Sequence, residues 1–285
     1  MIKLLITDLD DTLYSWIEFF VPAFYGMLDE LSKLLGKPRG FLQQEYKQVH
    51  QEKGSVEFPY ATLLLPSVKA AYPGSTREEL LEKLDPVFHK FNYIRKKNLK
   101  LYPGVEETLK NISEKGITIV GYTDSAEENG FYRLKKLKID DFFKNVYVSY
   151  SQYERPKHLP SSSKIKIVSE KKPNPEVLKK ICKTECVAVE EAVYLGDSLT
   201  KDIFMASRAG ITSVLCKYPC DKKEQKELYL KLVAISNWTK EDFKNEAAVK
   251  ELCKKENIHP DYEIKEFKEI FMILEQLNKS VQTFV

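Results

Sequence analysis

Residues 1–13 read MIKLLITDLDDTL, an apolar run that ends in three aspartates within four positions. Residues 3–7 carry the leucine and β-branched side chains of a short strand that is buried on both faces. Asp8, Asp10 and Asp11 then follow. Two like charges about 4 Å apart repel by roughly 1 kcal/mol in water and by roughly 4 kcal/mol at an effective dielectric constant of 20. The sequence therefore predicts that a cation compensates these carboxylates.

The composition is that of a globular protein. The chain has 285 residues, of which 43% are hydrophobic, and its 45 basic and 42 acidic residues leave a formal charge of +3. This charge is far from the concentrated basic surface of a dedicated nucleic-acid binder. No apolar stretch approaches the roughly 20 residues of a membrane span, and the N-terminal run becomes acidic too soon for a signal peptide. We expect a cytoplasmic protein without nucleic-acid or membrane partners, and the sequence leaves the oligomeric state open.

The cysteines admit two interpretations, a zinc site or free thiols. The five residues are Cys182, Cys186, Cys216, Cys220 and Cys253. An odd number without a secretory signal argues against disulfides. The two C-x₃-C pairs admit a zinc site, but the first pair falls in a helix-like run and the second begins at the end of a strand-like run. Ordinary free thiols are the favoured interpretation.

Strand-like runs alternate with helical patterns over most of the chain. The strand-like runs are residues 2–7, 117–122, 146–149, 192–195 and 211–216, and the helical patterns are residues 105–115, 129–138, 175–183 and 202–209. This alternation predicts an α/β fold, a three-layer Rossmann-like core with a parallel sheet covered on both faces. Ligands bind such sheets beyond the carboxyl ends of the strands.

One stretch interrupts the alternation. Residues 14–98 are mostly helical, with amphipathic runs at 17–35, 41–52, 77–84 and 86–97. We expect a helical cap domain at 14–98, inserted into a discontinuous core of residues 1–13 and 99–285. The alternative is a packing domain that never contacts ligand. Residues 151–172 are predicted as an exposed loop or flap, and residues 262–277 as a last edge strand and helix.

Four motifs follow strands or open a helix. They are D-L-D-D-T at residues 8–12, Y-T-D-S at 122–125, K-P-N-P at 172–175 and G-D-S-L-T-K-D at 196–202. In this order they resemble the haloacid dehalogenase-like superfamily, whose pattern is D-x-D-x-T, a strand-end Ser or Thr, a Lys before a helix, and G-D-x-x-x-x-D. The resemblance covers residues 1–13 and 100–217 together with the final strand and helix.

The residues themselves indicate the chemistry of phosphoryl transfer. Asp8, held rigidly at a strand end, suits attack on phosphorus to form an acyl-phosphate. Asp10 can protonate the leaving alcohol and later deprotonate the hydrolytic water. Mg²⁺, which prefers oxygen ligands, can bind Asp8, the backbone carbonyl of Asp10, and Asp197. This ion would be the cation that the aspartate cluster requires.

Further residues are expected to hold the phosphate. Thr123 and the amide of Asp124 offer hydrogen-bond donors to its oxygens, and Lys172 supplies a fixed positive charge. Asp202 is expected to anchor Lys172 or a metal-bound water. Thr12 is expected to support the site from its turn.

Some assignments have competing interpretations. Asp11 is more simply explained as a turn residue. Arg155 could replace Lys172 as the fixed cation, but Lys172 stands directly before a helix and is preferred. Asp124 and Ser125 depart from the T-N often found in relatives, which puts a side-chain contribution at these two positions in doubt.

The resemblance implies a fold more firmly than a reaction. Ion pumps of this superfamily carry D-K-T-G-T, which is absent here, and dehalogenases lack the second aspartate, which is present as Asp10. The favoured function is a Mg²⁺-dependent phosphatase that acts on a small phosphorylated metabolite, a sugar phosphate or a nucleotide monophosphate. A phosphomutase remains an alternative. A non-catalytic phospho-ligand binding protein would be expected to lack Asp8, Asp10, Lys172 or Asp197, and all four are present.

Overall fold

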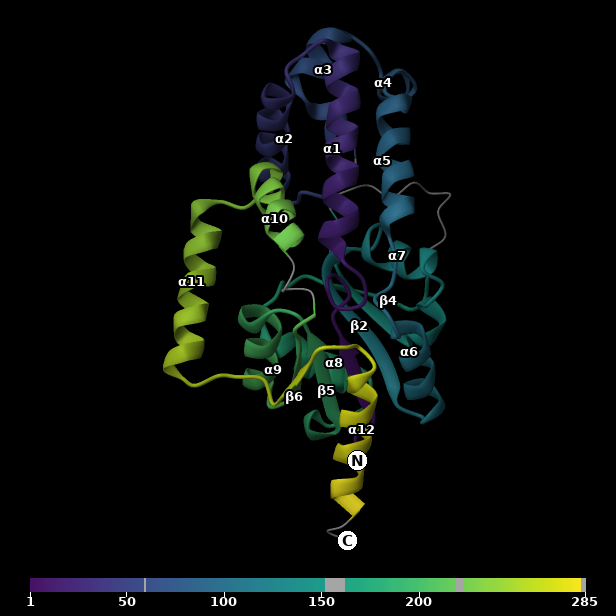
Figure 1. Cartoon of the computed structure of the whole chain (residues 1–285), viewed down its shortest axis with the longest axis vertical. Coiled ribbons are helices and arrows are strands. Elements are labelled where there is room, and N and C mark those ends of the chain that lie inside the picture. The colour runs from purple at the N-terminus through teal and green to yellow at the C-terminus, as the bar shows by residue number, and fades with distance from the viewer. Residues whose placement is uncertain (59, 152–161, 219–222, 283–285) are drawn as a thin grey trace. The chain divides into compact units, whose positions relative to one another are not determined.

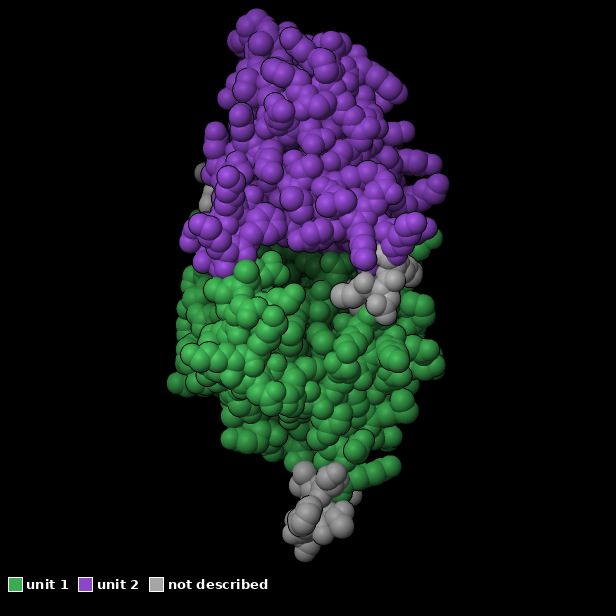
Figure 2. Space-filling model, turned by 60° about the vertical axis from the view of Figure 1, so that its left-hand side comes forward, with its two compact units in different colours: residues 1–15, 100–221, 246–285 green, residues 16–99, 222–245 purple. Residues whose placement is uncertain are grey.

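The computed structural model describes residues 1–58, 60–151, 162–218 and 223–282 (Figure 1). The chain divides into two compact units, which Figure 2 distinguishes by colour. The sheet unit comprises Met1–Ser15, Lys100–Asp221 and Glu246–Val285. The helical unit comprises Trp16–Leu99 and Lys222–Asn245.

The sheet unit is built on seven parallel strands in the order β4-β3-β2-β1-β5-β6-β7. The strands are β1 (Leu4–Thr7), β2 (Thr118–Ala126), β3 (Asn145–Ser149), β4 (Ile165–Val168), β5 (Ala192–Gly196), β6 (Thr212–Cys216) and β7 (Tyr262–Ile264). The central strand, β1, is buried along its whole length, as its unbroken apolar run predicts. The predicted α/β fold with a parallel sheet is confirmed.

Helices cover the two faces of this sheet. They are α6 (Val105–Glu114), α7 (Gly130–Lys136), α8 (Pro175–Thr184), α9 (Phe204–Ala209) and α12 (Glu269–Gln282), with a π-helical turn at Leu199–Ile203 and short 3₁₀ turns at Asp140–Phe142 and Val189–Glu191. Helices α8 and α9 pack together, as do α6 and α12. Alternate strand residues such as Leu4, Ile6 and Val120 form one core with α8 and α9.

The register of the central strands determines where the polar motifs meet. Thr7, the last residue of β1, pairs with Gly121 on β2 and with Leu195 on β5. The amide of Asp8 then donates to the carbonyl of Leu195 at 2.8 Å. The residues that follow all three strands therefore emerge at the same edge of the sheet, where parallel α/β folds bind ligands.

The helical unit is an all-helical assembly. Its elements are α1 (Trp16–Leu35), α2 (Arg39–Lys53), a 3₁₀ turn (Ala61–Leu64), α3 (Pro66–Ala71), α4 (Arg77–Lys83), α5 (Asp85–Asn98) and α10 (Lys223–Ile235). Helices α1 and α5 pack extensively. They approach closely at Gly26, where an added Cβ would lie 2.3 Å from Cδ1 of Ile94. The amphipathic runs predicted in residues 17–97 all form helices.

Helix α10 belongs to the helical unit, although it follows the sheet in sequence. It buries Leu232 and Ile235 and packs against α1 and α2. Three side chains donate to the backbone carbonyls near its C-terminus: Tyr25 to Lys231 at 2.9 Å, Lys47 to Val233 at 3.2 Å and His50 to Ile235 at 2.6 Å. The expected domain of residues 14–98 therefore differs from the helical unit, which also takes in Lys222–Asn245. Helix α11 (Lys240–Lys255) contributes residues to both units.

Two further sequence predictions need comment. The loop expected over residues 151–172 is wrong for Ile165–Val168, which form the edge strand β4. Its exposed Lys166 and its 55% exposed Ile167 suit an edge, where only one side pairs. Cys182, Cys186, Cys216 and Cys253 are free, as expected, and none belongs to a potential metal-binding group among the described residues. Cys220 lies outside them. Within the described ranges no helix is both long and apolar enough to cross a membrane.

Candidate active site

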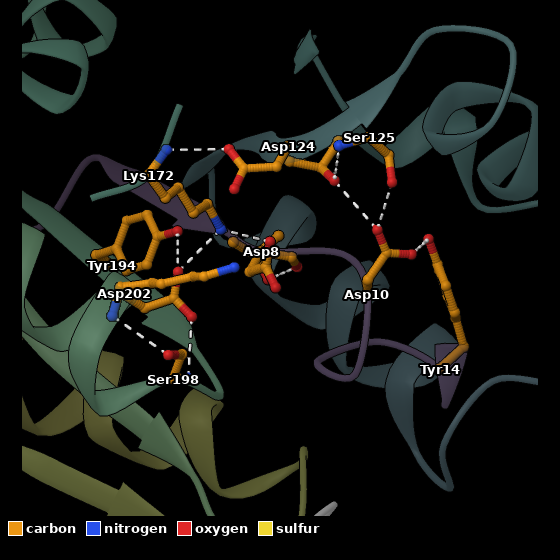
Figure 3. A network of polar contacts seen from close by, with 12 residues as sticks. Asp8, Asp10, Tyr14, Asp124, Ser125, Lys172, Tyr194, Ser198 and Asp202 are labelled. Atoms are coloured by element: carbon orange, nitrogen blue, oxygen red, sulfur yellow. Dashed lines mark hydrogen bonds and ion pairs between the residues drawn. The ribbon is translucent and has the colours of Figure 1, made fainter. Parts of the chain in front are cut away.

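Asp8 is the first residue after β1, and its side chain is 9% exposed. Its Oδ1 accepts a hydrogen bond from Nζ of Lys172 at 2.5 Å (Figure 3). The lysine side chain is equally buried, at 4% exposure. Two groups that are 164 positions apart in sequence thus form a buried ion pair at the carboxyl edge of the sheet.

Lys172 contacts a second carboxylate as well. Its Nζ donates to Oδ1 of Asp202 at 2.9 Å, and the ammonium lies over the rings of Tyr122 and Tyr194, 5.1 and 5.6 Å from their centroids. Its backbone amide donates to Oδ1 of Asp124 at 3.0 Å. The lysine is therefore fixed at both ends, which suits a charge that must be in place before a reaction begins.

Asp202 is held in the π-helical turn that follows β5. Its Oδ1 also accepts from the hydroxyl of Tyr194 at 2.8 Å, and its Oδ2 accepts from the amide of Ser198 at 3.0 Å. Gly196 makes this close approach possible, because an added Cβ there would lie 2.4 Å from Cγ of Asp202. The carboxylate is thus occupied by three donors, counting Lys172.

Asp197 completes an acidic group. One carboxylate oxygen from each of Asp8, Asp197 and Asp202 lies within 4.8 Å of the others. Hard oxygen ligands of this kind suit Mg²⁺. Asp202 already accepts from three donors, so Asp8 and Asp197 are the carboxylates of this group with more capacity left for an ion.

The electrostatics show the cost of this arrangement. Burial raises the pKa of Asp8 well above its usual range, and Asp202 and Asp197 add to the rise, while Lys172 opposes it. Burial, Asp202 and Asp11 likewise raise the pKa of Asp197. Burial alone would lower the pKa of Lys172, but Asp202 and Asp8 raise it well above its usual value, so it stays charged. Lys172 and Lys201 both lower the pKa of Asp197, but not enough to offset its burial and the neighbouring carboxylates. A divalent cation would restore the balance of charge.

Asp10 lies in a second polar cluster beside the first. Its Oδ1 accepts from the hydroxyl of Tyr14 at 2.9 Å and from Nη1 of Arg133 at 2.6 Å. Its Oδ2 accepts from the hydroxyls of Thr123 at 3.2 Å and Ser125 at 2.8 Å. In Figure 3, Asp10 faces Ser125 and Tyr14, whereas Asp8 faces Lys172. The two aspartates of the first motif thus have separate sets of partners.

The structure brings some of the predicted site residues together and places others elsewhere. Asp8, Lys172, Asp197 and Asp202 form one group. Thr123, which is expected to donate to the phosphate, donates to Asp10 at 3.2 Å and accepts from the amide of Ser125 at 3.0 Å. The Asp124 carboxylate bonds to the backbone of Lys172.

The remaining candidates lie in turns or outside the described residues. Thr12 is fully buried, its Oγ1 has no hydrogen-bond partner among the described residues, and its carbonyl accepts from the hydroxyl of Tyr218. Asp11 occupies a turn with φ of 58°, in agreement with its interpretation as a turn residue. Arg155, the alternative to Lys172, lies outside the described residues.

Two residues of these clusters were missed at the level of sequence. Arg133 lies in a helical pattern where a basic side chain normally points to solvent, so no signal marked it. Tyr194 could have been noticed, because a tyrosine within a fully buried strand needs a partner for its hydroxyl.

Comparisons with known proteins agree with this geometry. The sequence profile of the haloacid dehalogenase-like hydrolase family matches residues 5–216. A glyceraldehyde 3-phosphate phosphatase from Methanopyrus kandleri is 30% identical over 75% of this chain and 83% of its own. A 2-haloacid dehalogenase from Pseudomonas syringae superposes with a TM-score of 0.58 at 19% identity, covering 97% and 99% of the two chains. The HAD-hydrolase YfnB from Bacillus subtilis, bound to magnesium, gives a TM-score of 0.52 at 18% identity over 96% and 99%. The chain belongs to the haloacid dehalogenase-like hydrolase family.

Proposed function

We propose that this protein is a Mg²⁺-dependent phosphatase that hydrolyses a small phosphorylated metabolite through an aspartyl-phosphate on Asp8. The observation that carries the proposal is the buried Asp8–Lys172 pair, at 2.5 Å, within 4.8 Å of the Asp197 carboxylate. An exposed ion pair would not indicate a functional site, because surface ion pairs contribute little energy. A buried group with more negative than positive charge, located where parallel sheets bind ligands, is typical of a site that awaits a cation and an anionic substrate.

The reaction follows from the positions of these groups. Lys172 contacts Oδ1 of Asp8, so Oδ2 is the expected attacking atom. As the Asp8–phosphorus bond forms, the bond from phosphorus to the leaving alcohol breaks. Asp10 must enter this step protonated, passes its proton to the alcohol and is left as the carboxylate. Asp10 then takes a proton from the water that attacks phosphorus and releases Asp8. Lys172 offsets the charge that develops on the phosphoryl oxygens.

Asp202 and Tyr194 would keep Lys172 in place during both steps. Asp8, Asp197 and the Asp10 carbonyl would hold Mg²⁺, which supplies charge neutralisation at the phosphoryl group. The magnesium in the YfnB structure supports this assignment for the family fold.

The substrate class rests on a relative. The Methanopyrus kandleri protein, at 30% identity, is a phosphatase of glyceraldehyde 3-phosphate, which favours a sugar phosphate over a nucleotide monophosphate. A screen of phosphorylated metabolites against the purified protein with Mg²⁺ tests the proposal. We expect turnover of small sugar phosphates and loss of turnover in chelator. A protein that is inert toward sugar phosphates and nucleotides, or fully active in chelator, would contradict it.

We also propose that the helical unit acts as a cap. The chain leaves the sheet unit at Ser15, seven positions after Asp8, and returns at Lys100. Tyr14 and Leu101 pair as a β-bridge, which brings the two crossings together. Such inserts gate access in many enzymes. Beryllium fluoride with Mg²⁺ should slow amide hydrogen exchange within Trp16–Leu99, and unchanged exchange there would favour a packing domain.

A further inference from the structure

Arg133 is a buried arginine that no motif of this site explains. It lies in α7 and is 3% exposed. Its Nη1 donates to Oδ1 of Asp10 at 2.6 Å and to Oγ of Ser125 at 3.3 Å. A guanidinium cannot lose its charge in a protein, so its burial is tolerated only where an anion and further acceptors surround it. Asp10 provides that anion.

The contact between the start of α7 and the end of β2 fixes the position of Arg133. Helix α7 begins at Gly130, where an added Cβ would lie 3.0 Å from Cγ2 of Thr123 and 3.5 Å from Cβ of Ser125. The helix therefore starts in close contact with the end of β2, the strand that carries both hydroxyls bonded to Asp10. Arg133 thus reaches Asp10 from a rigid element, not from a loop.

The two oxygens of the Asp10 carboxylate have different hydrogen-bond partners. Arg133 and Tyr14 bond to Oδ1, while Thr123 and Ser125 bond to Oδ2. Ser125 also accepts from Arg133, so the arginine holds both the carboxylate and one of its hydroxyl partners. Without Arg133, the Asp10 carboxylate would keep its three hydroxyl donors but lose its charged partner.

We propose that Arg133 is the positioning residue for Asp10, the group that transfers the proton in both steps of the reaction. This inference rests on the proposed phosphatase function. A side chain that transfers a proton must be held in one orientation, since small displacements are costly to catalysis. Arg133 donates to Asp10 and Ser125, whereas Lys172 holds Asp8 and Asp202. We therefore expect the loss of Arg133 to affect proton transfer more than the nucleophile or the fixed charge.

The leaving group of the substrate separates this role from a merely structural one. An aryl phosphate such as 4-nitrophenyl phosphate has a leaving group that needs no proton, whereas an alkyl phosphate needs one. Arg133→Met removes the charge and keeps an unbranched side chain of similar length. We expect kcat/KM of this variant to fall at least about tenfold more for alkyl phosphates than for 4-nitrophenyl phosphate. The loss for alkyl phosphates should not exceed the factor of about 10² to 10⁴ that general acid-base catalysis contributes.

Three further variants control the measurement. Arg133→Lys keeps the positive charge and should restore part of the alkyl phosphate activity. Lys136→Met removes an exposed charge from the same helix and should change neither activity. Asp10→Asn with Arg133→Met should be no slower than Asp10→Asn alone, because residues that act through one another are not additive. Circular dichroism confirms that each variant is folded.

The outcomes are distinct. Equal losses for aryl and alkyl phosphates, or additive losses in the double variant, would overturn the positioning role and leave the phosphatase proposal intact. A faster Arg133→Met variant would overturn it as well, since an anchor cannot be improved by removal. A folded wild-type protein without phosphatase activity would overturn the proposed function, and this inference with it.

Discussion

The two units differ in how their buried polar groups are paired. In the sheet unit, Asp8, Asp197 and Asp202 lie close together, and Lys172 pairs with Asp8 and Asp202. Burial and mutual repulsion raise the pKa values of Asp8 and Asp197. Among the described residues of the helical unit, every buried polar side-chain atom has a hydrogen-bond partner. Glu45 accepts from the amide and the hydroxyl of Ser67, the hydroxyls of Tyr46 and Thr62 bond to each other, and His50 donates to a carbonyl of α10.

This difference indicates that the acidic cluster of the sheet unit lowers the stability of the protein. A cluster with unbalanced charge destabilises the metal-free protein and is retained only where it has a function. A satisfied group stabilises its surroundings and needs no ligand. Substitutions should therefore separate the units. Those in the acidic cluster should lower activity without lowering stability, and those at the satisfied groups of the helical unit should lower stability without changing activity.

The largest effect is expected from Asp8→Asn. It removes the nucleophile, so turnover of every phosphate ester should fall to background, because no covalent intermediate can form. Steady-state assays with 4-nitrophenyl phosphate and a sugar phosphate measure this. Residual turnover within about a hundredfold of the wild type would show that another group attacks phosphorus.

Asp197→Asn tests the balance of charge. It should raise the Mg²⁺ concentration needed for activity sharply, since one anionic ligand is lost. In chelator the variant should be more stable than the wild type by roughly 1 to 4 kcal/mol, the repulsion expected between charges about 4 Å apart. Urea unfolding in chelator measures the free energy. A destabilised variant would mean that the acidic cluster is not repulsive.

Glu45→Ala applies the opposite test to the helical unit. It leaves the amide and hydroxyl of Ser67 without their acceptor in a buried position, so the free energy of unfolding should fall by about 2 to 4 kcal/mol. Turnover with saturating Mg²⁺ should not change. Ser67→Ala, which removes only the hydroxyl, should cost less. A neutral Glu45→Ala would show that water replaces the carboxylate.

His50 makes the stability of the helical unit dependent on pH. Burial lowers its pKa to about 4, below the usual 6.5. As the pH falls, the unfolded chain binds the proton first, so this stability is present above about pH 6.5 and is lost toward pH 4. Between about pH 7.5 and pH 5 the wild type should lose about 2 kcal/mol more than His50→Asn. Parallel losses in the two proteins would contradict the assignment.

The sequence predicted much of the sheet unit because its signals are local. The apolar run of residues 3–7 could only be a buried strand, and the helices from 105 to 183 each had an apolar face and a Gly or Pro at a boundary. The edge strand Ile165–Val168 was missed because it is only four residues long and lies within a polar, lysine-rich stretch. The assignment of α10 to the helical unit was missed because the fold, and not the local pattern, decides which unit buries Leu232 and Ile235.

The site was predictable where motifs mark it. Asp8, Lys172, Asp197 and Asp202 were grouped from four short stretches, and the structure brings their side chains together. Their catalytic roles stay predictions. Arg133 could not be found, because a single arginine in an amphipathic helix carries no sign of burial. Its contact with Asp10 depends on the packing of α7 against β2.

The most direct test of the central claim is to trap the intermediate. Asp10→Asn keeps the nucleophile and the backbone carbonyl, but it cannot activate the hydrolytic water. With Mg²⁺ and 4-nitrophenyl phosphate, mass spectrometry of the quenched variant should find a phosphoryl group on Asp8. Phosphate on another residue, or unimpaired turnover of an alkyl phosphate by Asp10→Asn, would contradict the account.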